Sequence, residues 1–261
     1  TTSKSTSTTT KSTAAQASAV DATSADELPL GAQWHGMWAE WDDAKRTKVL
    51  DLLKANGVTE VRIDVGWTNI QPNKGSYDMS WGVPLVDKVV GMAHDRGFNV
   101  LVTFWLTPSW ANGGAGNKVL PTDVNDYAKA LKWAAARWKN EVTAWEIWNE
   151  PDSDDFLKPP SATSYTKLLK AAYPAVKEGS PNAKVVIGGP ESVNTDWLEQ
   201  VYEASVRNYF DIMAVHPYMG NVAPETTDNG TPYRLDHTGA LVNLMKEYSD
   251  TRKPIWYTEF G

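Results

Sequence analysis

The run Ala144-Trp145-Glu146-Ile147-Trp148-Asn149-Glu150-Pro151 is typical of a buried strand that ends abruptly in a loop. Its end holds the carboxyl group of Glu150, beside the amide of Asn149 and after a large aromatic side chain. Parallel βα barrels carry their reactive groups at the carboxyl ends of strands, and a carboxyl group placed there can give or take a proton. The run therefore predicts a strand that presents Glu150 to a reaction site.

A second run, Pro254-Ile255-Trp256-Tyr257-Thr258-Glu259-Phe260-Gly261, repeats the pattern with Glu259 at its end. Glycoside hydrolysis uses a pair of carboxyl groups, whereas two surface glutamates at strand ends are the alternative. Glu146 falls on the same side of an ideal strand as Glu150, so alternation alone does not separate them. We choose Glu150 for its place at the strand end, and expect Glu146 either to pair with a buried arginine or to be a second inward carboxylate.

Composition divides the 261 residues into two parts. Residues 1–27 are mostly Ser, Thr and Ala and predict a disordered tail or linker, either an ordinary terminus or one that carries O-glycans. Residues 28–261 hold all 13 tryptophans and predict one catalytic domain. A net charge of −7 with no basic face argues against nucleic acid as a partner, and no apolar run is long enough for a membrane span. The absence of cysteine excludes disulfides and thiolate chemistry.

Strand-like and helix-like segments alternate along the second part. The strands are expected at 31–36, 58–65, 99–105, 142–148, 184–188, 212–215 and 255–258, and the helices at 42–55, 81–96, 123–139, 164–178, 195–208 and 236–250. Near-continuous apolar strands between amphipathic helices predict a parallel sheet covered on its outside, either doubly wound or closed as a barrel. No glycine-rich phosphate motif follows a strand, and polar or aromatic residues follow almost all of them, which favours a (β/α)8 TIM barrel.

The motifs at the ends of two strands carry a family resemblance. Trp148-Asn149-Glu150-Pro151 and Thr258-Glu259-Phe260-Gly261 resemble the fourth- and seventh-strand motifs of glycoside hydrolase clan A. Further runs are most similar to family 39 and related cellulase-like glycosidases: Val61-Arg62-Ile63-Asp64 with Trp67 and Gln71-Pro72, Phe104-Trp105 with Thr107-Pro108-Ser109-Trp110-Ala111, and His216-Pro217-Tyr218. The resemblance spans about Trp34 to Gly261 and implies an eight-fold βα barrel and a retaining mechanism.

The same resemblance implies roles for individual residues. Glu150 would be the acid/base and Glu259 the nucleophile, while Asn149 would hydrogen-bond the 2-hydroxyl of the sugar. Tyr218 would touch the nucleophile, and His216 would line the site near the acid/base, with a structural histidine as the alternative.

Two further polar residues are candidates for the site. Arg62 on the second strand is expected to hydrogen-bond Glu259 and keep it ionised, unless it forms a structural ion pair with Asp64 or Glu60. His35 ends the first strand and is expected either to contact a sugar hydroxyl or to belong to the core. No clustered His/Asp spacing appears, which predicts no catalytic metal and no cofactor.

Three tryptophans, Trp67, Trp105 and Trp110, are candidate platforms for the apolar faces of sugars, although a tryptophan in or near a strand is more often part of the core. Trp110 is the preferred one because it follows Pro108-Ser109 and precedes Gly113-Gly114 in a loop.

These observations lead to a specific hypothesis for the function. We expect a secreted or cell-surface retaining O-glycoside hydrolase that cleaves β-linked oligosaccharides or polysaccharides through a glycosyl-enzyme. A transglycosylase with the same two glutamates and a non-catalytic glycan-binding barrel are the alternatives. The clan pattern also includes an eighth strand whose aromatic residue floors the sugar site. Because the sequence stops after the seventh strand, we expect a truncated barrel, a fragment lacking roughly 50–80 residues on typical βα-unit lengths.

Overall fold

The computed structural model describes residues 28–223 and 234–261, and the predicted tail at 1–27 lies outside them. Its strands are β1 (Gly31–Gln33), β2 (Glu60–Gly66), β3 (Asn99–Trp105), β4 (Val142–Ile147), β5 (Lys184–Ile187), β6 (Met213–Val215) and β7 (Ile255–Tyr257). Its helices are α1 (Asp43–Ala55), α2 (Trp67–Ile70), α3 (Gly82–His94), α4 (Val124–Arg137), α5 (Ala162–Gly179), α6 (Thr195–Glu203) and α7 (Thr238–Glu247), with 3-10 turns η1 (Ser109–Ala111) and η2 (Leu235–His237).

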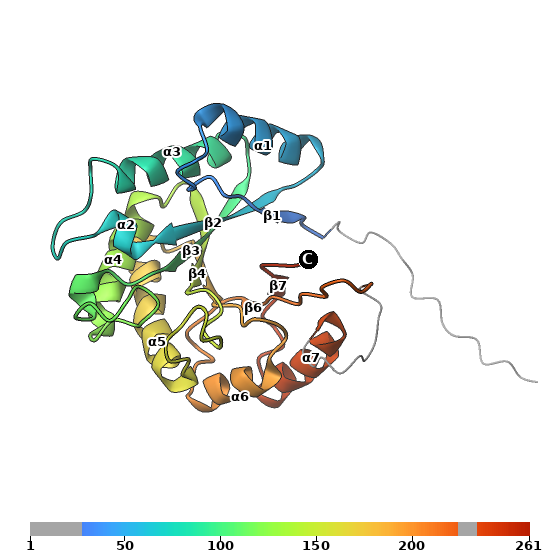
Figure 1. Cartoon of the computed structure of the whole chain (residues 1–261). Helices are drawn as coiled ribbons and strands as arrows, with labels where there is room; N and C mark the ends of the chain where they lie inside the picture. The colour runs from blue at the N-terminus through green and yellow to red at the C-terminus, as the bar shows by residue number, and fades with distance from the viewer. Residues whose placement is uncertain (1–27, 224–233) are drawn as a thin grey trace, which may run out of the picture.

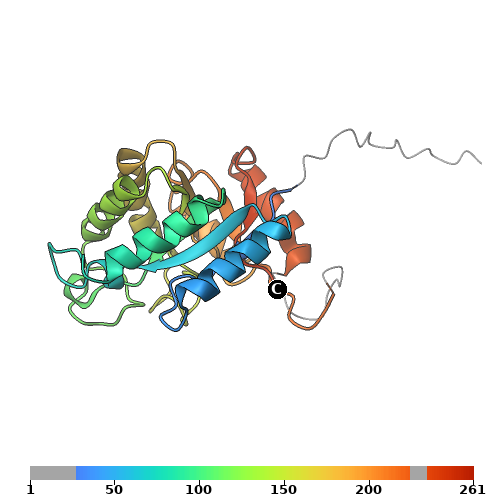
Figure 2. The same cartoon turned by 90° about the horizontal axis from the view of Figure 1, so that it is seen from above.

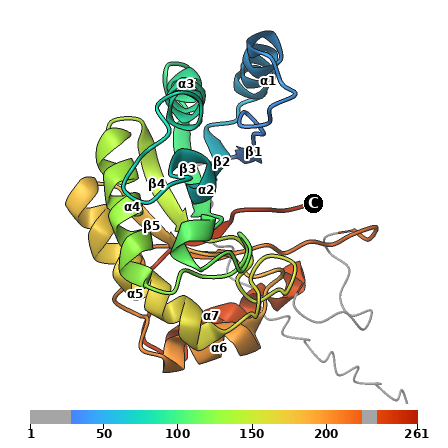
Figure 3. The ribbon, with the colours of Figure 1, turned by 60° about the vertical axis from the view of Figure 1, so that its left-hand side comes forward.

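The strands are parallel and follow one another in sequence order. β1 to β5 form one sheet, β6 pairs with β7, and a bridge between Val186 and Ile212 joins β5 to the segment that enters β6. The strands lie inside and the longer helices outside (Figure 1). Figure 2 shows α1 and α3 side by side along β2, and Figure 3 shows α4, α5 and α6 following one another around the outside. The predicted fold class, a βα barrel, is confirmed, with seven strands in the described residues.

Short polar caps start the main helices where the sequence predicts. Asp42 accepts a hydrogen bond from the Lys45 amide at 2.7 Å before α1, and Asp123 accepts one from the Asn125 amide at 2.9 Å before α4. Some predicted boundaries are wrong: β1 ends at Gln33 rather than at 36, α7 ends at Glu247 rather than at 250, and α6 ends at Glu203 rather than at 208. The chain leaves the helix there because Ser205 adopts a left-handed φ of 64°.

Alternation along the strands sorts side chains between the helical layer and the barrel interior. On β3, Phe104 packs outward against Tyr127 of α4, whereas Thr103 turns inward toward Glu146. Tyr165 of α5 ties the tops of two strands together, since its hydroxyl donates to the Ile147 carbonyl at 3.0 Å and accepts the Gly188 amide at 2.6 Å. This bond fixes the loops that carry polar residues after β4 and β5. None of the described helices combines the length and the apolar character needed to cross a membrane.

Candidate active site

Arg62 lies at the centre of the polar groups inside the barrel and is only 4% exposed. Its Nε donates to Glu146 at 2.7 Å, and its two terminal nitrogens donate to Glu259 and Asn149, each at 2.7 Å. The predicted contact between Arg62 and Glu259 is therefore present. The alternative pairing with Asp64 is weaker, at 4.0 Å. One guanidinium thus orients residues from β4 and from the end of β7.

Glu146 is the carboxylate that pairs with the buried arginine. It is fully buried and also accepts hydrogen bonds from the hydroxyls of Thr103, at 2.6 Å, and Thr258, at 2.8 Å. Burial alone would raise its pKa, but the Arg62 charge and the hydrogen bonds outweigh burial and lower the pKa to about 2. Glu146 is therefore an anion beneath the site, which settles the choice that the sequence left open.

Glu150 lies just past the end of β4 on strained backbone. Trp148 and Glu150 adopt left-handed φ angles of 74° and 40°, which cost roughly 1–3 kcal/mol each for residues other than glycine. The surroundings hold this geometry, because the Trp148 ring is fully buried and the Glu150 amide donates to the Gly189 carbonyl at 3.1 Å. Glu150 itself is 4% exposed, and burial raises its pKa. Glu150 therefore keeps its proton to a higher pH than an exposed glutamate does.

His216 contacts Glu150 directly, as the sequence predicts. Its Nδ1 lies 2.8 Å from Glu150 Oε1, and its Nε2 lies 3.0 Å from the Thr258 hydroxyl. The ring fits because Gly189 has no side chain: a Cβ there would lie 2.7 Å from the imidazole. Burial lowers the pKa of His216, but the neighbouring carboxyl groups of Glu146 and Glu150 raise it to about 9 overall.

Glu259 follows β7 and faces the same space. Arg62 donates to one oxygen at 2.7 Å, and the Tyr218 hydroxyl donates to the other at 2.6 Å. The predicted contact between Tyr218 and the nucleophile candidate is thus present. The side chain of Glu259 is 20% exposed, more open than that of Glu150. A carboxylate that is paired with a guanidinium and has an open side is suited to attack a bound substrate.

Glu150, His216 and Glu259 offer atoms that all lie within 4.8 Å of one another. Three such residues could hold a metal ion by their ligand types. The Nδ1 of His216 is already engaged with Glu150, however, so metal binding would have to displace that contact. The predicted absence of a catalytic metal stays a prediction.

The structure treats the candidate sugar platforms differently. The prediction of Trp67 as a sugar platform is wrong, because its side chain is fully buried and its indole N–H donates to Gln71. Trp110 is partly buried and packs edge-on against Trp67, with its indole donating to the Gln71 carbonyl. Trp105 is partly exposed and packs against Trp148, and its buried indole nitrogen has no protein partner. Of these three, Trp105 therefore has the free donor.

His35 stacks on Trp38 with ring centroids 4.0 Å apart, and it too has a buried ring nitrogen, Nδ1, without a protein partner. The structure brings it near the arginine side of the site, because Gln33, two residues earlier, accepts from Arg62 at 2.9 Å and donates to Asp64 at 2.7 Å. Sequence reasoning missed Gln33 and Thr258 as members of the network. Their only signal is position: Thr258 belongs to the quoted motif at Glu259, and Gln33 lies in the predicted first strand.

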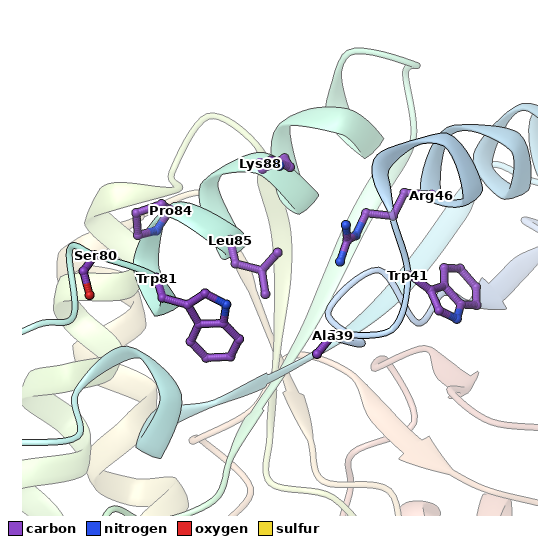
Figure 4. Close-up of a pocket in the computed structure, with 8 residues that line it drawn as sticks. All are labelled: Ala39, Trp41, Arg46, Ser80, Trp81, Pro84, Leu85 and Lys88. Carbon is purple, nitrogen blue, oxygen red and sulfur yellow. The ribbon is translucent and has the colours of Figure 1, made fainter.

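A separate cleft of about 330 Å³ lies between α1 and α3 (Figure 4). Trp41 and Trp81 stand on opposite sides of it, and Trp81 is 50% exposed. Its charged side chains are occupied: Arg46 donates to Asp43 and to backbone carbonyls, and Lys88 donates to Asp43. Neither glutamate lines this cleft, so the candidate chemistry lies elsewhere.

Comparison with known proteins agrees with the fold. The profile described as cellulase (glycosyl hydrolase family 5) matches residues 20–261. A β-xylosidase of Caldicellulosiruptor saccharolyticus is 29% identical over 130 residues, or 47% of this chain and 26% of that protein. Endo-1,4-β-xylanase C of Phanerodontia chrysosporium is 27% identical over 154 residues, or 57% of this chain and 37% of that protein.

A solved structure gives the same result for the fold. A family 39 glycoside hydrolase of Bacteroides cellulosilyticus WH2 superposes with a TM-score of 0.70 at 26% identity, over 89% of this chain and 48% of that one. The chain thus aligns with about a quarter to a half of the length of these proteins.

The chain belongs to the cellulase family of glycoside hydrolases, and the predicted resemblance to clan A is confirmed. It carries a glycosidase domain.

Proposed function

We propose that this protein is a retaining β-glycosidase in which Glu259 is the nucleophile and Glu150 the acid/base. The observation that carries the proposal is the close approach of the two carboxyl groups, with atoms of Glu150 and Glu259 within 4.8 Å. Retaining glycosidases hold their carboxyl groups about 5–5.5 Å apart, whereas inverting enzymes leave about 6.5–9.5 Å for a water molecule.

The surroundings support this division of roles. Glu150 is buried with a raised pKa, so it can deliver a proton to the glycosidic oxygen. Glu259 has Arg62 beside it and keeps an open side toward the substrate. In the first step a Glu259 oxygen bonds to the anomeric carbon, the glycosidic bond breaks, and the leaving oxygen takes the Glu150 proton. In the second step water attacks that carbon, its proton passes to Glu150, and Glu259 departs.

Azide rescue tests the assignment. Glu259→Ala should abolish turnover of aryl β-glycosides, and azide should restore product as the inverted glycosyl azide. Glu150→Ala should spare the first step on substrates with good leaving groups, and azide should then give the β-glycosyl azide. Rescue with the two configurations exchanged would swap the roles, and an inverted product from the unmutated enzyme would remove the retaining mechanism.

The relatives support a proposal for the substrate class. Those named above are a β-xylosidase and an endo-1,4-β-xylanase. We therefore propose β-1,4-linked xylan or its oligosaccharides as the substrate, with oligosaccharide products. A panel of 4-nitrophenyl β-xyloside, β-glucoside and β-mannoside, with xylan and cellulose, tests this choice. Higher kcat/KM on a glucoside and cellulose would exclude it.

The transglycosylase alternative uses the same two glutamates and differs in the acceptor. Product analysis with added xylose oligosaccharides separates the two, because a transglycosylase lengthens the acceptor whereas a hydrolase releases reducing sugar. We also propose an extracellular location, on the grounds of the acidic composition and the Ser/Thr-rich residues 1–27. Fractionation of the producing cells with an antibody against the domain tests that location.

A further inference from the structure

Glu146 and Thr258 are buried or half-buried groups that take no part in the steps above, yet they form a chain of hydrogen bonds that ends at Glu150. Thr258 lies 2.8 Å from Glu146 and 3.0 Å from His216, and His216 lies 2.8 Å from Glu150. Each contact needs one proton, and the number of available protons fixes which atom donates.

The donor and acceptor in each of these hydrogen bonds can be assigned by starting from Glu146. As an anion, its oxygens only accept, so the single hydroxyl proton of Thr258 must point to Glu146. The Thr258 oxygen can then only accept from His216, which means that Nε2 carries a proton. When Glu150 is ionised it can also only accept, so Nδ1 carries a proton as well. His216 is then an imidazolium.

We infer that Glu146 and Thr258 are positioning residues that hold His216 as a hydrogen-bond donor at both ring nitrogens, which leaves Glu150 Oε2 as the oxygen that carries the acid proton. The inference rests on the proposed role of Glu150. Oε1 receives the Nδ1–H bond throughout, and Oε2, the oxygen that does not face His216, gives and regains the proton in the two steps. If His216 did not donate from Nδ1, a protonated Glu150 could donate from Oε1 to a neutral imidazole. Its proton would then be bound to His216 and would not reach the leaving oxygen of the substrate.

The charges around His216 support a lasting positive charge. Glu146 lies 3.9 Å from Nε2, Glu259 lies 3.9 Å from Nδ1, and Glu150 is in direct contact. Arg62 is the opposing positive charge, and it is paired with Glu146 and Glu259. Three carboxyl groups against one guanidinium favour an imidazolium, and they outweigh the burial of His216, which by itself disfavours the charged ring.

Imidazole nitrogen NMR tests this inference without a substrate. The chain has four histidines, so His216 can be assigned from a His216→Gln spectrum. In the unmutated full chain, both His216 nitrogens should be protonated at pH 6–8. Thr258→Val removes the acceptor of Nε2–H, and the midpoint of the His216 titration should fall by about one to two pH units, the equivalent of one charge-assisted hydrogen bond.

Thr258→Ser is the matched control, because it keeps the hydroxyl, and it should titrate like the parent. Glu146→Gln is a second variant that should also lower the midpoint. A single neutral tautomer at pH 6 in the parent, or equal midpoints for Thr258→Val and Thr258→Ser, would overturn the inference.

Kinetics add a separate readout on aryl β-xylosides. Thr258→Val should lower kcat/KM about tenfold for a poor leaving group and little for 2,4-dinitrophenolate, which needs no proton. Equal losses on both substrates would show that Thr258 acts on something other than the proton of Glu150, and would also overturn the inference. If the NMR result holds but no glycoside is hydrolysed, the proposed function fails and the positioning of His216 stands.

Discussion

Replacing Arg62 by methionine should destabilise the protein far more than replacing a surface arginine, because it leaves the buried carboxylate of Glu146 without its positive partner. Arg62 holds Glu146 at 2.7 Å, and both side chains are shielded from water. The pKa of Glu146 falls from its ordinary 4.5 to about 2, which at ~1.4 kcal/mol per pH unit corresponds to about 3 kcal/mol. This agrees with the roughly 3–5 kcal/mol expected when one partner of a buried ion pair is removed.

The effect should depend on pH in a defined direction. A depressed carboxylate pKa stabilises the fold above the ordinary value of 4.5, and this contribution disappears as the pH falls toward 2. In Arg62→Met the pKa of Glu146 is higher, so Glu146 takes up a proton at a higher pH than in the parent. Protonation removes the cost of burying an unpaired carboxylate. The difference in the free energy of unfolding between parent and variant should therefore be larger at pH 7 than at pH 4.

This difference can be measured as a difference in Tm, with circular dichroism used to monitor thermal unfolding. About 3 kcal/mol corresponds to a fall in Tm of ~6–12 °C for a domain of this size. Arg96→Met is the control, because Arg96 pairs with Asp51 on the surface, where ion pairs contribute about 0–1 kcal/mol. A fall in Tm for Arg62→Met no larger than for the control, or a difference between parent and variant that is constant from pH 7 to pH 4, would refute the account of Glu146 as a buried anion.

Three further predictions concern the site. Tyr218→Phe removes the 2.6 Å hydrogen bond to Glu259 and should lower kcat on an aryl β-glycoside about 10- to 100-fold with little change in Tm, because Tyr218 is exposed; unchanged kcat would contradict its role. Trp110→Ala should lower kcat/KM by the equivalent of roughly 1–3 kcal/mol if it stacks on sugar, whereas a large fall in Tm with unchanged kinetics would make it a core residue. Dialysis against EDTA should leave kcat/KM unchanged, and activity restored by a divalent cation would show that the Glu150, His216 and Glu259 cluster needs a metal.

The sequence predicted the contacts that depend on strand ends meeting at one edge of a parallel sheet. Arg62 with Glu259, Tyr218 with Glu259 and His216 with Glu150 all join residues from different strands or the loops that follow them. Such contacts need only the strand order and the end at which each residue lies. They therefore follow from the fold class and the resemblance.

The sequence could not separate tryptophans that face the substrate from tryptophans that face the core. Trp67 and Trp105 both follow or end an apolar strand, yet Trp67 is fully buried in α2 and Trp105 is partly exposed at the end of β3. The difference arises because Trp67 begins a short helix that turns it outward toward Tyr127 of α4. A helix of four residues leaves no periodic signal in the sequence.

Nor could alternation place Glu150. Counting along an ideal strand puts Glu146 and Glu150 on one side, yet the two carboxyl groups differ in the structure: the pKa of Glu146 is lowered by its partners, and the pKa of Glu150 is raised by burial. The separation comes from the left-handed backbone at Trp148 and Glu150, which ends the strand between them. That backbone is maintained by tertiary contacts, namely the buried Trp148 ring and the bond from the Glu150 amide to Gly189. The Trp148 ring packs against Trp105 at the end of β3, and Gly189 follows β5, so the backbone shape at Glu150 depends on the two neighbouring strand ends and the sequence of β4 alone does not contain it.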